Sequence, residues 1–140
     1  NALGIGMVHQ HFKLVEIFSV LDNIILGVEP TNSAGFLKKA EARRRVVELS
    51  EKYGLRIEPD ALISDITVGM QQRTEILKML YRNNEILIFD EPTSGLDYRH
   101  MMEVSSLLKE LGKEEHIILV VSHDIEFINA TCTNIFSLQP

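Results

Sequence analysis

Unbroken apolar runs alternate with helical spacings along this chain, and together they predict an α/β fold. Residues 86–89 and 117–121 are two such runs, and polar residues follow each of them. Runs of this length are typical of strands that are buried on both faces in a parallel sheet. We therefore predict two buried strands, with Asp90 and Glu91 directly after the first and His123 shortly after the second.

Helical spacing marks three longer segments. Residues 39–53 carry an amphipathic pattern that ends before Gly54, and residues 67–82 begin at Thr67, which is a good N-cap. After Asp97, apolar residues recur at intervals of three, four and three, which predicts a third amphipathic helix. Four shorter elements are expected: strands at 4–10 and 134–138, a helix at 21–27 with Asp22 or Asn23 near its start, and a helix at 125–131.

The composition is that of an ordinary globular domain. The 140 residues match the size of one domain, with 45% hydrophobic and 24% charged residues. The net charge of −6 provides no basic field, so nucleic acid is not an expected partner. No apolar run approaches the roughly 20 residues of a membrane-spanning helix. Cys132 is the single cysteine, which excludes an internal disulfide and favours a cytoplasmic location.

Polar side chains with complementary chemistry follow three of the expected strands. Gln10 follows the first, Asp90 and Glu91 follow the second, and His123 follows the third. If these strands are parallel neighbours, their carboxyl ends meet at one edge of the sheet. A carboxylate pair can hold a hydrated Mg²⁺ and orient a water, so this set suits metal-assisted phosphoryl transfer. Taken singly, the carboxylates could start a loop or cap a helix, and the histidine could be a structural cap.

The start of the 67–82 helix is a second candidate site. Thr67 offers a capping hydroxyl, and Gly69 lets a ligand approach the backbone. The free N–H groups at a helix N-terminus attract anions, so a phosphate is the expected kind of ligand.

These features resemble, in order and spacing, the motifs of ABC-type ATPases over nearly the whole chain. Residues 85–97 read Glu-Ile-Leu-Ile-Phe-Asp-Glu-Pro-Thr-Ser-Gly-Leu-Asp and resemble the Walker B strand with the D-loop that follows it. Residues 7–12 look like the Q-loop, residues 66–70 are similar to the signature motif, and His123 looks like the switch histidine of the H-loop.

The resemblance implies a partial P-loop NTPase core with parallel buried strands and an added α-helical subdomain. Residues 1–12 and 83–140 would form the RecA-like α/β core, and residues 13–82 would form the α-helical signature subdomain. The implied ligands are ATP and Mg²⁺. Gln10 and Asp90 would hold the metal, and Gln10 would also couple the site to the membrane subunits.

The resemblance also implies roles for the remaining site residues. Glu91 would be the general base, and His123 would contact the γ-phosphate of ATP. Asp97 would reach across a dimer interface. Three residues of the signature region would contact ATP that is bound to the other subunit: Thr67, Gly69 and Gln71.

Two departures from the family pattern modify these expectations. The signature region reads Ile-Thr-Val-Gly-Met, and Met70 in place of a polar residue is expected to weaken the contact across the dimer. No Gly-x-x-x-x-Gly-Lys-Ser/Thr run occurs, which predicts a fragment that begins after the phosphate-binding loop. We therefore expect this chain alone to bind ATP poorly, to hydrolyse it at background rates and to self-associate through a sheet edge and face left open.

The predicted function is the ATP-binding and ATP-hydrolysing component of an importer-type ABC transporter. Its expected partners are a second ATP-binding subunit and the membrane permease subunits, at the cytoplasmic face of the cell membrane. Residues up to about Leu80 look closest to the ATPases of simple-sugar or nucleoside importers. Two alternatives stay open: an ABC-type ATPase without a transport role, and a non-catalytic binding or regulatory domain.

Overall fold

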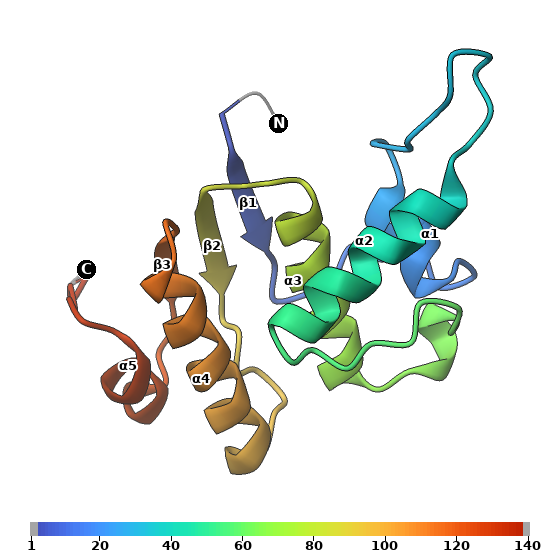
Figure 1. The fold of residues 1–140 in the computed structure, drawn as a ribbon. Helices are drawn as coiled ribbons and strands as arrows, with labels where there is room; N and C mark the ends of the chain where they lie inside the picture. Colours follow the sequence, from blue (N-terminus) through green and yellow to red (C-terminus); the bar gives the residue numbers. More distant parts are fainter. Residues whose placement is uncertain (1–2, 139–140) are drawn as a thin grey trace. The chain divides into compact units, whose positions relative to one another are not determined.

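The computed structural model describes residues 3–138, which divide into two compact units (Figure 1). One unit is formed mainly by residues 11–84, and the other by residues 5–10 and 85–138. Residues 1–2 and 139–140, at the ends of the segments expected to form the core, lie outside the described residues.

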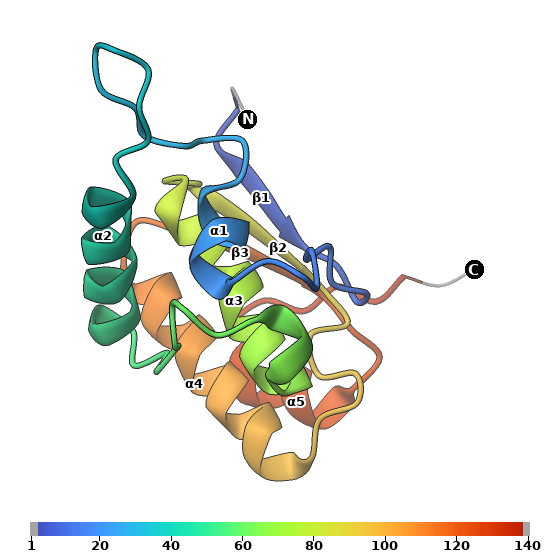
Figure 2. The ribbon, with the colours of Figure 1, turned by 90° about the vertical axis from the view of Figure 1, so that its right-hand side faces the viewer.

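The unit formed by residues 11–84 is helical. It contains α1 (Val20–Ile25), α2 (Lys39–Lys52), the short 3-10 helix η1 (Ile63–Asp65) and α3 (Val68–Tyr81). Helices α1 and α2 both pack against α3 (Figure 2). Apolar side chains with at most 1% of their surface exposed fill the space between them: Val20, Leu21, Ile24, Val46, Ile63, Ile76 and Leu77.

Side-chain hydroxyls cap two of these helices. Thr67 caps α3, as predicted, by accepting a hydrogen bond from the N–H of Met70 at 3.3 Å. Ser19 caps α1, since its Oγ accepts from the N–H of Asp22 at 3.1 Å and donates to the Asp22 carboxylate at 2.9 Å. Asp22 therefore lies in the first turn, whereas Asn23 is buried and bonds to the backbone of Val15.

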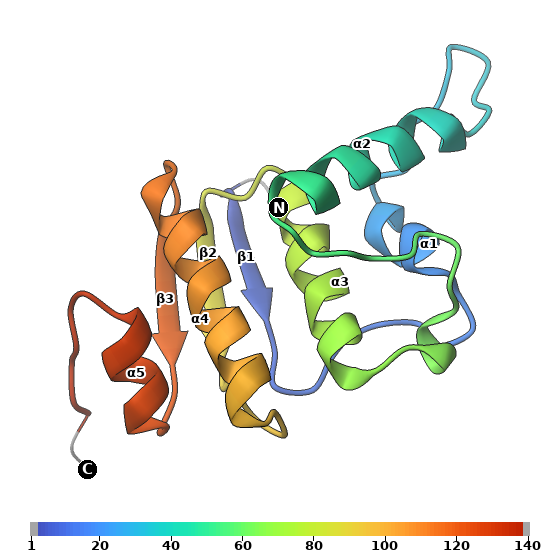
Figure 3. The same cartoon turned by 60° about the horizontal axis from the view of Figure 1, so that its bottom comes forward.

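The second unit is a three-stranded parallel sheet with two helices. The strands are β1 (Ile5–Val8), β2 (Ile86–Asp90) and β3 (Ile117–Val121), in the order β1-β2-β3, and all three run in the same direction (Figure 1). Helix α4 (Tyr98–Lys113) runs along one face of this sheet, and α5 (Ile125–Thr131) packs against α4 (Figure 3). These observations confirm the predicted α/β class.

The face of the sheet toward α4 forms the core of this unit. Leu87 and Phe89 of β2 are fully buried, and the register places Val8 of β1 beside Phe89. Helix α4 contributes its apolar stripe at the spacing expected from the sequence: Met101, Val104, Leu108 and Leu111 are all buried. The alternation of side chains along a strand places the remaining strand residues on the other face.

That other face is largely open, which corrects the expectation of strands buried on both sides. On β3, the exposed fractions of Ile117, Leu119 and Val121 are 60%, 52% and 55%, and Met7 of β1 is 40% exposed. Within this unit, α4 and α5 pack on one side of the sheet and on each other, so apolar side chains of the opposite face remain in contact with solvent. An apolar run predicts a strand, but it does not predict how many layers cover that strand.

The expected strand at residues 134–138 is absent from the described part of the chain. These residues have no regular secondary structure, and Ile135, Phe136 and Leu138 are 56%, 88% and 94% exposed. A strand requires a partner whose backbone it can pair with, and this segment pairs with none of the described strands. Among residues 3–138, no helix has both the length and the apolar content needed to span a membrane.

The open sheet face predicts concentration-dependent self-association. Replacing Leu119, in the middle of β3, with lysine should lower the mass measured by light scattering, because a charge then interrupts the apolar surface. The free energy of unfolding should change by only about 0.5 kcal/mol, as is usual for exposed positions. The matched control is Ile17→Lys, at a 79% exposed position in the helical unit. A monomeric parent chain, or an equal effect of both variants, would contradict this prediction.

Candidate functional site

The carboxyl ends of the three parallel strands carry the polar residues that the sequence singled out. Gln10 lies two residues after β1, Asp90 is the last residue of β2 with Glu91 next to it, and His123 lies two residues after β3. The register pairs Asp90 with Val121, so the carboxyl ends of β2 and β3 are level. The parallel sheet therefore brings these residues to one edge, where open α/β sheets bind their ligands.

Glu91 and His123 are in direct contact. The Nδ1 atom of His123 lies 2.7 Å from Oε1 of Glu91. The imidazole is 90% exposed, whereas the Glu91 side chain is only 18% exposed. The hydrogen bond to Glu91, and then its charge, raise the pKa of His123, and Asp124 adds a smaller contribution in the same direction. The carboxylate beside this imidazole therefore favours its protonated form.

The backbone of Glu91 is left-handed, with φ of 47°. A residue other than glycine in this region carries about 1–3 kcal/mol of strain, which the surroundings must offset. The N–H of Glu91 donates to the carbonyl of Val121 at 2.8 Å, and its own carbonyl accepts from the N–H of Ser94 at 3.1 Å. Both main-chain bonds hold the residue in this conformation at the end of β2. The sequence carried no signal of this strain.

Gln10 contacts the loop that follows β2. Its Nε2 donates to the hydroxyl of Ser94 at 3.3 Å, which leaves the carbonyl oxygen of the same amide free to act as a ligand. This oxygen and the carboxylate of Asp90 are hard donors of the kind that Mg²⁺ prefers. In residues 3–138, no group of three or more His, Cys, Asp or Glu side chains forms a cluster that could hold a metal ion. Any Mg²⁺ bound by Gln10 and Asp90 therefore needs further ligands from water or phosphate.

Asp97 lies at the start of α4 and caps that helix. Its carboxylate accepts from the N–H of His100 at 2.9 Å and lies 2.8 Å from Nδ1 of the same residue. The backbone hydrogen bond from His100, followed by the side-chain contact, lowers the pKa of Asp97. Its side chain is 66% exposed, so it remains accessible from solvent.

Thr67, Gly69 and Gln71 belong to the helical unit. Thr67 is the N-cap of α3, and Gly69 is the second residue of that helix. The side-chain amide of Gln71 donates to the carbonyl of Ile63 at 3.3 Å. One hydroxyl and the first turn of a helix thus lie together at this end of α3, an arrangement that suits an anion. The hydrogen bond of Gln71 links α3 to the preceding helix η1.

The structure adds three residues that the sequence did not single out. Ser94 contacts Gln10, and Thr93 lies 3.4 Å from the carboxylate of Asp124 through its hydroxyl. Asp124 also caps α5 by accepting from the N–H of Phe127. An aspartate just before an apolar helical segment is a signal that could have identified this cap, whereas nothing local in the sequence indicates the contacts of Thr93 and Ser94.

Comparison with known proteins identifies the family of this chain. Residues 2–94 match the family described as ABC transporter. The chain belongs to this family. It is 52% identical over 133 residues to the nucleoside import ATP-binding protein NupA of Lactococcus lactis subsp. cremoris, covering 95% of this chain and 26% of that protein. It is also 52% identical over 119 residues to the guanosine import ATP-binding protein NupO of Bacillus subtilis, covering 85% of this chain and 23% of that protein.

More distant relatives show the same relationship. The arabinose import ATP-binding protein AraG of Paraburkholderia xenovorans is 34% identical over 131 residues, which is 94% of this chain and 25% of that protein. A dimeric ATP-binding cassette solved with ADP and Pi in a post-hydrolysis state has a TM-score of 0.72 at 26% identity, covering 91% of this chain and 55% of that one. The chain thus spans about a quarter of the length of the curated relatives it matches.

The contact between Glu91 and His123 predicts a pH dependence. Because the pKa of His123 is raised above its ordinary value of 6.5, the pair stabilises the folded chain below that pH, and the effect is lost as the pH rises through the folded pKa. Glu91→Gln should therefore lower the pKa of His123, as measured by NMR titration of the five histidines. The control is Glu110→Gln on α4, which should leave His123 unchanged; an unaltered His123 pKa in Glu91→Gln would refute the contact.

Proposed function

We propose that this chain supplies the metal- and water-handling part of the ATP-binding subunit of an ABC importer. The observation that carries the proposal is the Glu91–His123 pair at the carboxyl edge of a parallel sheet. Membership of the ABC transporter family and the import functions named for its relatives support it. The two relatives with 52% identity are named for nucleoside and guanosine import, so a nucleoside importer is the class we favour.

The donors present suit Mg²⁺ and the γ-phosphate end of ATP. The carboxylate of Asp90 and the free amide oxygen of Gln10 would be the protein ligands of the metal, whose charge would neutralise the phosphate oxygens. The 140 residues contain no Gly-x-x-x-x-Gly-Lys-Ser/Thr run, whose backbone amides and lysine hold the phosphates in P-loop proteins. The residues of this chain therefore account for one side of an ATP site.

Glu91 is the base in the proposed reaction. Its carboxylate contacts Nδ1 of His123, and a carboxylate in this position can accept a proton from a water placed for attack on the γ-phosphate. With Nδ1 of His123 directed to Glu91, the other ring nitrogen is available to donate to a phosphate oxygen. A raised pKa of His123 increases the fraction in which both ring nitrogens are donors.

The remaining roles concern a second ATP-binding subunit and the permease. The hydroxyl of Thr67 and the helix turn at Gly69 would face ATP bound to that second subunit, next to Gln71. Asp97, exposed at the start of α4, would reach across the same interface. Gln10 would transmit the state of the metal site to membrane permease subunits. The assembled protein would then lie at the cytoplasmic face of the cell membrane.

The proposal predicts weak ATP binding by these 140 residues alone. Because the phosphate-cradling amides and the lysine are not part of the sequence, isothermal titration of the chain with Mg-ATP should show no binding in the micromolar range. Micromolar affinity would contradict the proposal that these residues form only one side of an ATP site.

A chimaera tests the function itself. The matching quarter of NupA from Lactococcus lactis is replaced by this chain, which shares 52% of its residues there. The chimaera should hydrolyse ATP, and Glu91→Gln should reduce the rate by about 10²-fold or more, as expected for loss of a general base.

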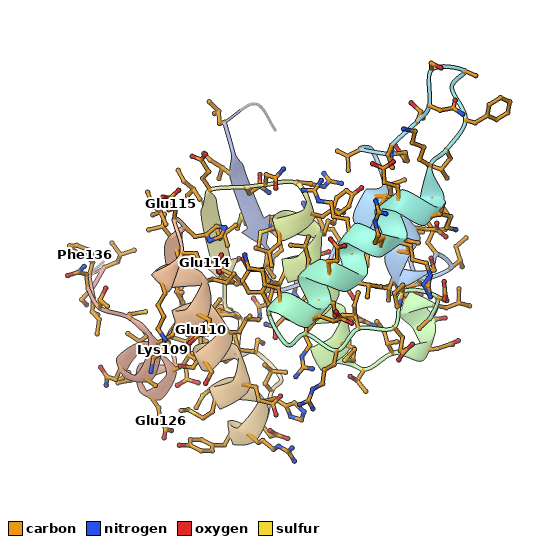
Figure 4. The ribbon with its side chains drawn as sticks, in the orientation of Figure 1. Lys109, Glu110, Glu114, Glu115, Glu126 and Phe136 are labelled. Atoms are coloured by element: carbon orange, nitrogen blue, oxygen red, sulfur yellow. The ribbon has the colours of Figure 1, made fainter. Side chains whose placement is uncertain are left out.

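The matched control for this test is Glu110→Gln. Glu110 lies on α4, where its carboxylate contacts Lys113 and 63% of its side chain is exposed (Figure 4). This variant should keep the parent rate. A folded chimaera without ATPase activity, or one whose activity survives Glu91→Gln, would favour the non-catalytic alternative.

A further inference from the structure

Two loops carry the Glu91–His123 pair, and His123 depends on its loop for its position. The imidazole is 90% exposed, so packing against neighbouring side chains contributes little to its orientation. The backbone on either side of it is fixed by Asp124, whose N–H donates to the hydroxyl of Ser122 at 3.0 Å. The carboxylate of Asp124 in turn accepts from the N–H of Phe127 at 3.0 Å, and Phe127 is fully buried. His123 therefore sits on a short segment that is anchored through Asp124.

Thr93 connects this segment to the loop that carries Glu91. Its hydroxyl donates to the second carboxylate oxygen of Asp124, with the atoms 3.4 Å apart, and Thr93 is only 8% exposed. Thr93 lies inside the turn that begins at Glu91, because the N–H of Ser94 donates to the carbonyl of Glu91. The N–H of Leu96 donates to the carbonyl of Thr93 in the next turn. A change in the position of Thr93 is thus transmitted to Glu91 through two residues of hydrogen-bonded turn.

We infer that Thr93 is a positioning residue that, through Asp124, sets the spacing between the loops of Glu91 and His123. The inference rests on the proposed function in that Glu91 and His123 are the reacting pair. At 3.4 Å this hydrogen bond is long, but it is a side-chain link between the two loops, and removing the buried hydroxyl leaves Asp124 without this partner. Main-chain bonding of Glu91 to Val121 fixes the strand end, but the spacing of the side chains depends on the loops beyond it.

The test uses the full 140-residue chain and NMR of the His123 ring. Two carboxylates face this ring, those of Glu91 and Asp124, and both raise its pKa. Thr93→Val keeps the shape of the side chain and removes the hydroxyl, so the pKa of His123 should fall part of the way toward the value found in Glu91→Gln. Thr93→Ser restores the hydroxyl and should return the pKa to that of the parent chain.

Thr131→Val is the matched control. The hydroxyl of Thr131 also makes a hydrogen bond inside the same unit, to Ser105 at 2.7 Å, but it lies at the end of α5. This variant should leave the His123 pKa unchanged, which separates a local effect from general loosening of α4 and α5.

The outcomes are distinct. An unchanged His123 pKa in folded Thr93→Val, or an equal fall in Thr131→Val, would overturn the inference. If Thr93→Val does not fold, failure of Thr93→Ser to preserve the parent pKa is the overturning result. The His123 pKa reports the contact between Glu91 and His123 and does not require ATP hydrolysis. An inactive chimaera would therefore count against the proposed function but not against the role of Thr93.

Discussion

Hydrogen bonding of β2 to a parallel strand on each side determines where the functional groups of this chain lie. The register aligns Asp90 with Val121, and one residue later the N–H of Glu91 still bonds to the carbonyl of Val121. Because the three strands run in the same direction, residues separated by more than thirty positions end at the same edge. Without this pairing, Glu91 and His123 would have no reason to meet.

The end of β2 combines rigidity with exposure. Glu91 is held in a left-handed conformation by two main-chain bonds and is mostly buried, whereas its partner His123 is mostly open to solvent. A fixed carboxylate and an accessible imidazole suit a site where one group must stay aligned and the other must meet an incoming phosphate. The strain at Glu91 is tolerated because the buried strand beneath it, with Phe89 and Leu87, anchors the loop.

The two units divide the chemistry expected of this family. The helical unit presents a helix N-terminus with the Thr67 hydroxyl, which suits an anion, and the sheet unit presents amide and carboxylate oxygens, which suit a metal. Each unit has its own apolar core, so each kind of site rests on its own packed support.

The sequence alone predicted the strands at 86–90 and 117–121, the helix capped by Thr67 and the polar residues at the strand ends. These features follow from apolar spacing and capping residues, which act over a few positions. The sequence wrongly predicted strands buried on both faces and a strand at residues 134–138. Both errors have one reason: covering layers and strand partners come from distant parts of the chain. The left-handed Glu91, and the contacts of Thr93 with Asp124 and of Gln10 with Ser94, became visible once the chain was folded. Such contacts join residues far apart in sequence, and no local pattern encodes the distance between them.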